Sequence, residues 1–348
     1  MLAPRVQSAG ENSLTEKPLL EVKNLKKYYE ISQGLFKPKL VVKAVDDISF
    51  SINKGETFAL VGESGCGKST TGRTLLRLAG ATSGEIRYKG QDLLSLPTEK
   101  MRSLRKEMQM VFQDPYASLN PQMTIKQILM EPLRVHKKFH PDERLEKIIE
   151  ILEIVGLSKT HLDRHPNEFS GGQRQRIGIA RTVILNPDFI IADEPVSALD
   201  VSVQSQVINL MLELQKDFGL TYLFISHDLS VVKHMTDRVA VMYLGRIVEL
   251  ADTEELFSNP KHPYTQALIS AIPVSHPREA KERIVLKGDV PNPANPPSGC
   301  TFHTRCPFAM EMCKSIEPSL TEIATGHTAS CHLYSNNKGE KTNAIIYS

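Results

Sequence analysis

The chain has 348 residues, enough for one large domain with an appendage or for two domains of ordinary size. Its 41% hydrophobic and 24% charged residues are typical of a soluble globular protein, and a net charge of +2 gives no electrostatic reason to expect nucleic acid as the main partner. No apolar run reaches the roughly 18–20 residues that cross a bilayer. The polar residues 1–18 lack the apolar stretch of a secretion signal, so we expect a flexible leader on a cytosolic protein, where thiol buffers disfavour structural disulfides.

Along the chain, strand patterns alternate with helix patterns. Stretches 18–31 and 41–56 alternate apolar and polar residues, as half-buried antiparallel strands do. The short apolar runs at 57–62 and 188–194 predict buried strands. Further strands are expected at 85–90, 108–114 and 221–227, followed by a hairpin at 238–250. The pattern is helical over 123–156, where Pro141 occupies a first-turn position, and helices are expected at 68–78, 172–185, 201–217 and near residue 230.

This alternation predicts an α/β layered core with a parallel sheet, joined to an antiparallel β subdomain. The mostly helical stretch at about 114–185 is interpreted as an inserted helical subdomain, within a domain spanning 19–273. After about residue 273 the sequence becomes proline-rich and loses its periodicity. We therefore expect residues 274–348 to form a small, loop-rich, Cys-rich C-terminal domain.

The segment GESGCGKST, Gly62–Thr70, fits the pattern G-x-x-x-x-G-K-[ST] between an expected strand and an expected helix. Its glycines let backbone N–H groups converge on phosphate oxygens, and the following helix directs its positive N-terminus at the same anion. Lys68 would contact the β- and γ-phosphates, and the Ser69 hydroxyl would ligate Mg²⁺. The helix terminus would also lower the pKa of Cys66, although we interpret Cys66 as a small, inert residue of the loop.

The segment FIIADEP places two acids at the end of an apolar strand. Ligands of parallel sheets bind at the carboxyl ends of the strands. Asp193 would hold Mg²⁺, and Glu194 would polarise the attacking water. Together with the phosphate loop, these acids predict nucleotide hydrolysis.

The segment FSGGQRQR, 169–176, resembles the signature of ATP-binding-cassette (ABC) ATPases, and it precedes the acidic strand as theirs does. The resemblance implies the ABC cassette fold, with a RecA-like core. It also implies that Ser170, Gly171, Gly172 and Gln173 contact the ATP of a partner subunit, so that two chains enclose two ATP molecules.

Other motifs of the family appear in order. Gln113 in VFQDP matches the Q-loop glutamine near Mg²⁺ and the attacking water; SALD, 197–200, matches the D-loop, with Asp200 at the dimer interface; His227 matches the switch histidine. Tyr29 matches the aromatic residue that stacks on adenine, with Tyr28 as its rival. The resemblance thus implies catalytic roles for Glu194, His227, Gln113 and Lys68, and an ATP site comprising Tyr29, Gly62, Ser64, Gly65, Cys66, Gly67, Lys68, Ser69, Thr70, Gln113, Ser170, Gly171, Gly172, Gln173, Asp200 and His227.

Four narrower segments, VFQDPYASLNP, DEPVSALDVSVQ, HPYTQAL and the NPPSGC before the cysteines, resemble the ATPases of dipeptide/oligopeptide importers, and VSALDVSVQ resembles their F-type subunit. This resemblance implies a D-type sister ATPase, two permeases, an external peptide-binding protein, and attachment to the cytoplasmic face of the inner membrane. It implies that residues 115–129 and the helical subdomain dock the permeases. Nickel or opine import, and a soluble ABC ATPase not coupled to transport, are the alternatives.

Four of the five cysteines lie within the 32 residues from Cys300 to Cys331, in the pattern C-x5-C-x6-C-x17-C. The spacing does not fit the short knuckles of zinc sites closely, and four thiolates suit a [4Fe-4S] cluster. The resembling importer ATPases carry such a cluster in this region, which implies Cys300, Cys306, Cys313 and Cys331 as its ligands. Zn²⁺ is the alternative metal, and His303, His327 and His332 are substitute ligands.

Overall fold

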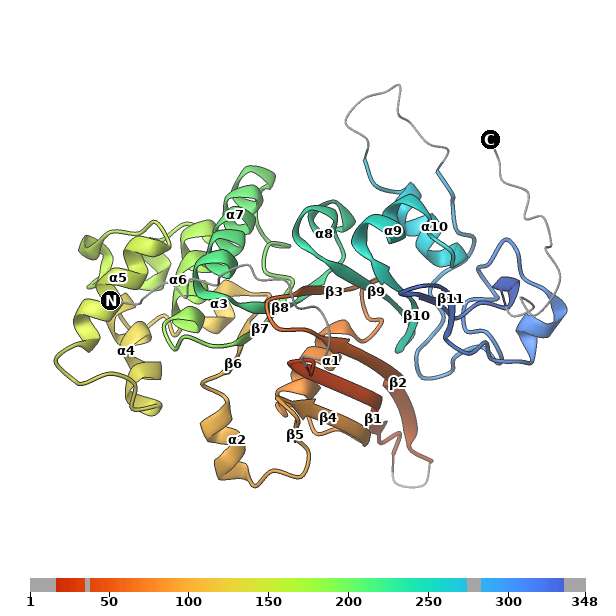
Figure 1. The fold of residues 1–348 in the computed structure, drawn as a ribbon, viewed down its shortest axis with the longest axis horizontal. Coiled ribbons are helices and arrows are strands. Elements are labelled where there is room, and N and C mark those ends of the chain that lie inside the picture. Colours follow the sequence, from red (N-terminus) through yellow and green to blue (C-terminus); the bar gives the residue numbers. More distant parts are fainter. Residues whose placement is uncertain (1–16, 35–37, 274–282, 335–348) are drawn as a thin grey trace.

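The computed structural model describes residues 17–34, 38–273 and 283–334. Residues 1–16 of the expected leader lie outside the described residues, as do 274–282 and 335–348 of the expected C-terminal domain. Figure 1 shows two sheets at the centre, a group of helices at one end and the C-terminal region at the other.

The larger sheet has eight strands in the order β11-β12-β10-β9-β3-β8-β7-β6. Strands β9, β3, β8, β7 and β6 run parallel, as the buried apolar runs predict, whereas β10, β12 and β11 are added antiparallel. The bounds are β3 Thr57–Val61, β6 Met108–Val111, β7 Phe189–Asp193, β8 Thr221–Ser226, β9 Arg238–Tyr243, β10 Arg246–Asp252, β11 Thr321–Ala324 and β12 His327–Ala329.

The smaller sheet is antiparallel, as expected from the alternation near the N-terminus. Its order is β2-β1-β4-β5, with bounds β1 Leu20–Ile31, β2 Leu40–Ile52, β4 Ser83–Tyr88 and β5 Gln91–Asp92. Helix α1 (Lys68–Leu75) packs between the two sheets. It ends three residues earlier than predicted, because Arg77 adopts a left-handed φ of 51° and its guanidinium donates to the carbonyls of Leu93 and Leu96.

The helical end of the molecule contains α3 (Pro115–Ser118), α4 (Ile125–Val135), α5 (Arg144–Ile154) and α6 (Gly171–Val183) (Figure 1). The expected helical stretch 123–156 contains two helices, α4 and α5, separated by Lys137 and Phe139, which both have positive φ. Helix α5 begins at Arg144, just after Pro141, which the sequence places in the first turn of a helix. The remaining helices are α2 (Thr98–Leu104), α7 (Val201–Phe218), α8 (Leu229–Met235), α9 (Thr253–Ser258) and α10 (Pro263–Ser270). The sequence patterns did not predict α2, α9 and α10.

The described part of the C-terminal region is joined to the core. β12 pairs with β10 through Glu249 opposite Ala329, and Phe302 is fully buried in the same hydrophobic cluster as β7 and β8. The expected boundary near residue 273, and an independent domain beyond it, stay predictions.

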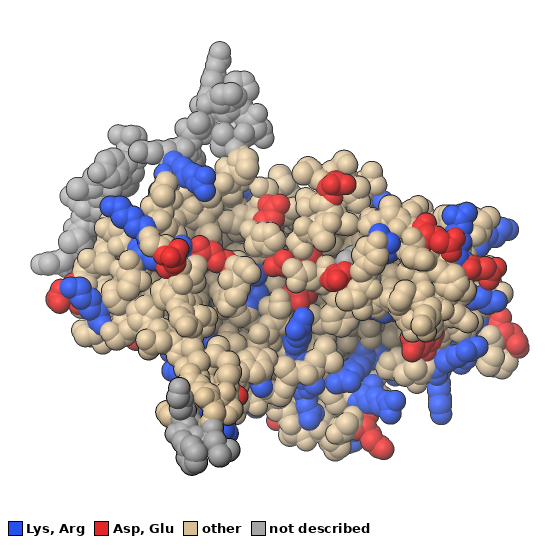
Figure 2. Space-filling model, turned by 180° about the vertical axis from the view of Figure 1, so that it is seen from behind, with Lys and Arg blue, Asp and Glu red and all other residues tan. Residues whose placement is uncertain are grey.

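Charge is unevenly distributed over the surface. Figure 2 shows Lys and Arg side chains gathered on the lower part of the face seen there, at the height of the smaller sheet and α2 in Figure 1. Acidic side chains are spread over the middle and upper parts of that face.

Candidate functional site

The predicted phosphate loop lies between β3 and α1, and the backbone of other strands packs directly against it. Gly62 and Gly67 have φ of 151° and 109°. A Cβ atom on Gly62 would lie 2.2 Å from the Met242 carbonyl oxygen, and one on Gly67 would lie 2.0 Å from that of Ala44. Only glycine fits these two positions, so the loop passes directly over the β9–β10 turn and β2.

Lys68 begins α1 with its amine turned back onto the loop. Its Nζ donates to the carbonyl oxygens of Gly62 (2.8 Å) and Glu63 (3.0 Å). These backbone acceptors hold the buried ammonium beside the loop's N–H groups, at the place where phosphate oxygens bind in loops of this kind.

Ser69 and Asp193 meet between α1 and the end of β7. The Ser69 hydroxyl donates to Asp193 Oδ1 at 2.7 Å, whereas the buried Oδ2 has no hydrogen-bond partner. Burial raises the pKa of Asp193. A hydroxyl beside an unpartnered carboxylate oxygen is an oxygen donor set that suits Mg²⁺, so the residues present fit this ion.

Glu194 follows Asp193, and its carboxylate contacts two other predicted catalytic side chains. Its Oε2 accepts from Gln113 Nε2 at 2.9 Å and lies 3.2 Å from His227 Nδ1. Glu194 has a positive φ of 48°, and its N–H donates to the Ile225 carbonyl of β8. The strained backbone turns the carboxylate away from the strand and toward the other two residues.

One cavity of about 650 Å³ unites most of these groups. Among the predicted site residues, its lining includes Gly62, Ser64, Gly65, Gly67, Lys68, Ser69, Thr70, Gln113, Glu194 and His227. The sequence patterns did not identify the other lining residues, which are Val42, Lys43 and Ala44 of β2, Glu63 of the loop, Leu229 of α8, the β9–β10 turn residues Leu244 and Gly245, Leu268 of α10, and Pro293. Glu63 lies in the phosphate-loop motif and Leu268 ends the segment HPYTQAL. The others carry no motif and reach the cavity only through the tertiary fold.

The signature residues lie outside the lining of this cavity, within the described part of the chain. Ser170 caps α6: its hydroxyl accepts from Gln173 N–H, and Gln173 Oε1 accepts from Ser170 N–H. A Cβ on Gly172 would come 2.3 Å from Val203 of α7, the helix that Asp200 precedes. The signature and the D-loop are therefore packed together, away from this chain's own phosphate loop.

The two adjacent tyrosines of β1 have different surroundings. The Tyr28 hydroxyl donates to Asp46, which also accepts from Arg246 at 2.6 Å. Tyr29 is 41% exposed, with Lys27 Nζ 4.5 Å from its ring centroid, and it pairs across the strands with Val42 of the cavity lining. The Tyr28 ring is thus tethered, whereas the Tyr29 ring is accessible on the face of the sheet that carries Val42.

The prediction of a lowered pKa for Cys66 is wrong. The residue is 5% exposed, and burial raises the pKa of its thiol. The α1 helix terminus does not offset this desolvation, so the side chain is an inert part of the loop, as the alternative interpretation held.

The four C-terminal cysteines lie in one region, and each has an electrostatic interaction with the other three. None of the five cysteines is in a disulfide. Burial raises the pKa of Cys300, brings that of Cys306 to about 11 and brings that of Cys331 to about 12. Among the described residues, no group of three or more His, Cys, Asp or Glu side chains is arranged to hold a metal ion, so the predicted cluster site is not confirmed.

Comparison with known proteins agrees with this geometry. The family described as "ABC transporter" matches residues 45–197, and the one described as "Oligopeptide/dipeptide transporter, C-terminal region" matches residues 248–313. The chain is 59% identical to the oligopeptide transport ATP-binding protein AppF of Bacillus subtilis, over 92% of this chain and 98% of that protein. It is 50% identical to the dipeptide transport ATP-binding protein DppF of Escherichia coli, over 92% and 96%.

A solved dimer of the ATP-binding cassette MJ0796, bound to ADP and Pi, superposes on 67% of this chain and 98% of that cassette with a TM-score of 0.60 and 26% identity. The cassette fold is thus shared with a protein whose solved structure is bound to ADP and Pi. The chain belongs to the ATP-binding proteins of ABC transporters, in the branch that carries the oligopeptide/dipeptide transporter C-terminal region.

Proposed function

We propose that the chain hydrolyses ATP to drive the import of dipeptides or oligopeptides, as the F-type ATPase of an ABC importer. The observation that carries this proposal is the single cavity that brings Lys68 and Ser69 together with Gln113, Glu194 and His227. A phosphate-binding loop facing a carboxylate, an amide and an imidazole is equipped for in-line attack of water on a phosphoryl group.

Each side chain has a distinct role in this proposal. Lys68 leaves the loop carbonyls to contact the β- and γ-phosphates, and Tyr29 stacks on the adenine. Glu194 accepts a proton from the attacking water, which Gln113 orients, and His227 contacts the γ-phosphate. Ser69, Gln113 and Asp193 would hold Mg²⁺, which when bound neutralises phosphate charge.

The proposed active form is a dimer with a D-type sister ATPase. The signature cap of Ser170, Gly171, Gly172 and Gln173 supports this, because the Ser170–Gln173 capping box does not use the N–H groups of Gly171 and Gly172. These two donors at the start of α6 are available for an anion outside the chain's own cavity. In the proposed dimer, Asp200 lies in the interface between the two ATPase subunits. The partner's signature would close the cavity around ATP.

A groove between the core and the helical end supports docking of a permease. It has a volume of about 310 Å³, and apolar side chains such as Leu78, Phe112 and Val135 line it together with Arg105 and His136. Leu78 and Val135 are 50% and 56% exposed. Next to it is a second hollow, in which Arg102, Lys106 and Lys137 outnumber the acidic Glu99, and Glu131 is the acidic residue of the groove itself. Positive charge therefore predominates, and the proposed occupant is an apolar helix that carries acidic residues.

The groove and the nucleotide cavity are adjacent along the chain. Phe112 lines the groove, and the next residue, Gln113, lines the cavity and contacts Glu194. A shift of the docked helix that moves Phe112 would therefore move Gln113, whose side chain contacts the Glu194 carboxylate.

This proposed assembly places the chain at the cytoplasmic face of the inner membrane. Among the helices in the described ranges, none has the length and apolarity to span a membrane.

We also propose that Cys300, Cys306, Cys313 and Cys331 hold a [4Fe-4S] cluster, with Zn²⁺ as the alternative. Four thiols that all interact with one another are a suitable donor set, and the bound group would cross-link a segment with little core of its own. Binding must draw the thiols closer together than they are here. Protein purified without oxygen should contain about four irons per chain; zinc alone would identify the alternative, and neither metal would reject the site.

The transport proposal is tested by reconstituting the chain with its co-purifying ATPase and permeases in lipid vesicles. Di- and oligopeptides delivered with the binding protein should stimulate ATP hydrolysis and accumulate inside. Stimulation by nickel or by an opine, and not by peptides, would identify that compound as the cargo. ATP hydrolysis without any membrane partner or cargo response would indicate a soluble ATPase.

A further inference from the structure

The phosphate loop of this chain carries an acidic residue whose carboxylate is bound by a side chain from a distant segment. Glu63 lines the nucleotide cavity between Gly62 and Ser64. Its N–H donates to the Tyr264 hydroxyl at 2.9 Å, and its carbonyl accepts from Lys68 Nζ at 3.0 Å. A carboxylate at this position repels the triphosphate that the loop binds, so something must compensate its charge.

Arg305 supplies that compensation. Its Nη1 donates to Glu63 Oε2 at 2.7 Å and its Nη2 donates to Oε1 at 3.0 Å, which is the paired geometry of the strongest arginine–carboxylate contacts. The Arg305 side chain is 8% exposed and that of Glu63 is 29% exposed. The guanidinium lies 5.9 Å from the ring centroid of Tyr243, and the Glu63 carboxylate raises the pKa of Arg305 further above its usual value.

The partners of the Glu63 carboxylate and N–H, Arg305 and Tyr264, come from the matched C-terminal region, residues 248–313, and not from the matched cassette segment, residues 45–197. Tyr264 is on α10, and Arg305 follows Phe302 in a turn in which the Arg305 N–H donates to the Phe302 carbonyl. The rings of Tyr243, Tyr264 and Phe302 pack together with centroids 4.8–5.4 Å apart. This aromatic cluster fixes the base from which Arg305 reaches the loop.

We propose that Arg305 is a positioning residue of the nucleotide site: it neutralises Glu63 and fixes the phosphate loop in the form that accepts ATP. The C-terminal region thereby contributes to nucleotide affinity. Arg305 immediately precedes Cys306, so this ion pair lies next to the cysteines in the chain.

Neutralisation and simple tethering predict different results. If Arg305 neutralises Glu63, removing the arginine exposes an uncompensated carboxylate, whereas removing both charges relieves it. If the pair only tethers the C-terminal region, Glu63→Gln and Arg305→Ala weaken binding alike, and the double variant is no better than either.

The test measures the affinity of the purified full chain for a fluorescent ATP analogue with Mg²⁺. Arg305→Ala should raise Kd about tenfold, and Arg305→Lys and Glu63→Gln should each raise it clearly less than Arg305→Ala does. Glu63→Gln combined with Arg305→Ala should return Kd to within about twofold of the unmodified chain. In the reconstituted transporter, Arg305→Ala should raise KM for ATP with a smaller change in kcat.

The matched control is Glu317→Gln, which removes a second ion pair between the core and the C-terminal region, that with Arg246, without touching the loop. Its Kd should stay unchanged. Failure of the double variant to recover, or an equal loss with Glu317→Gln, overturns the proposal. If Arg305→Ala does not fold, Arg305→Gln, which also removes the charge but keeps more of the side chain, gives the same comparison with and without Glu63→Gln. Loss of peptide stimulation with an intact Kd pattern would reject the transport function only.

Discussion

Gln113 donates its side-chain amide hydrogen to Glu194 at 2.9 Å, and the same carboxylate oxygen lies within reach of His227. Three segments distant in the sequence thus converge on one oxygen. A group that is to accept a proton from water needs a lone pair directed into the cavity, and the amide and imidazole set that direction.

Replacing Glu194 with Gln removes the proton acceptor and keeps the shape of the side chain. We expect ATP hydrolysis to fall about 10²–10⁴-fold, while ATP binding persists. With ATP and Mg²⁺, the variant and its sister subunit should accumulate as a closed dimer, which size-exclusion chromatography with light scattering detects. Turnover at the normal rate would remove Glu194 from the catalytic role.

Ser69→Ala removes the hydroxyl that donates to Asp193. The remaining Asp193 carboxylate would then hold Mg²⁺ with one oxygen ligand fewer in its vicinity. We expect the Mg²⁺ concentration that half-saturates ATP hydrolysis to rise by about tenfold or more, with a smaller change in nucleotide binding measured without Mg²⁺. Thr74→Ala, on the same helix but bonded only to the Thr70 carbonyl, is the control.

Val135→Asp places a charge in the apolar groove proposed for the permease. A buried, unpaired carboxylate in an interface costs several kcal/mol, so peptide-stimulated hydrolysis and co-purification with the permeases should be lost. Hydrolysis by the isolated subunit should change by less than about twofold. Leu145→Asp on α5, a 39% exposed leucine outside the groove lining, is the matched control. Equal loss in both variants would reject this groove as the docking site.

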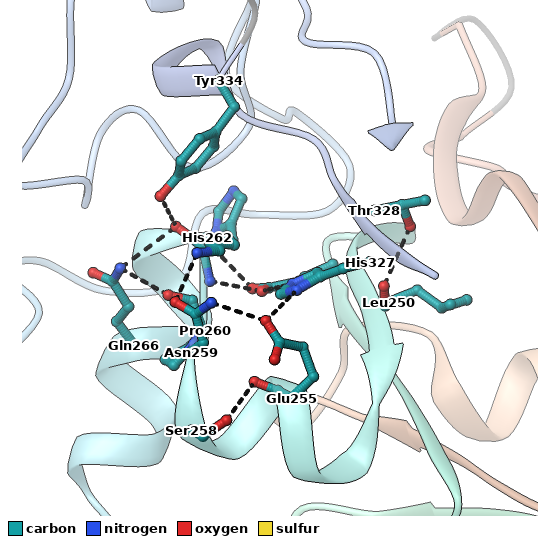
Figure 3. A network of polar contacts seen from close by, with 12 residues as sticks. Leu250, Glu255, Ser258, Asn259, Pro260, His262, Gln266, His327, Thr328 and Tyr334 are labelled. Atoms are coloured by element: carbon teal, nitrogen blue, oxygen red, sulfur yellow. Dashed lines mark hydrogen bonds and ion pairs between the residues drawn. The ribbon is translucent and has the colours of Figure 1, made fainter. Parts of the chain in front are cut away.

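His327 joins the C-terminal region to the core by a pH-dependent contact. Its Nε2 lies 2.7 Å from Glu249, a fully buried carboxylate of β10 that also accepts from the N–H groups of Lys261 and His262. Figure 3 shows His327 directed at Glu255 of α9 as well. The hydrogen bond with Glu249 raises the pKa of His327, whereas burial lowers that of His262 to about 4.

Since the folded pKa of His327 is raised, its stabilisation is fully present below the unfolded value of about 6.5 and is lost as the pH rises through the folded value. The difference in free energy of unfolding between the unmodified chain and His327→Gln should therefore shrink from pH 6 to pH 9. Urea titrations across this range measure it. Exposed His234→Gln should show no such trend, and a pH-independent difference would mean that His327 is neutral in the fold.

The sequence predicts the site better than it predicts the cavity walls. Lys68, Ser69, Asp193 and Glu194 lie next to strand ends, so short-range patterns place them correctly at the carboxyl ends of β3 and β7. Lys43, Gly245 and Pro293 reach the same cavity through long-range packing, for which a single sequence gives no signal.

In the C-terminal region, too, features that depend on long-range packing could not be predicted from the sequence. Its proline-rich composition predicts loops, and loops do dominate 283–320. The seven residues of β11 and β12 are too few to produce a periodic signal, and their strand conformation depends on β10 being available to pair with them.

The pairing of β12 with β10 also determines which strand forms this edge of the eight-stranded sheet. The five central residues of β10 are buried, and without β12 its backbone N–H and C=O groups would form an open edge that can recruit strands from other molecules. β11, which takes the outermost place, is four residues long and largely exposed and so offers a poor template. A chain shortened to residue 273 should therefore self-associate in a concentration-dependent way even though every motif of its nucleotide site is intact.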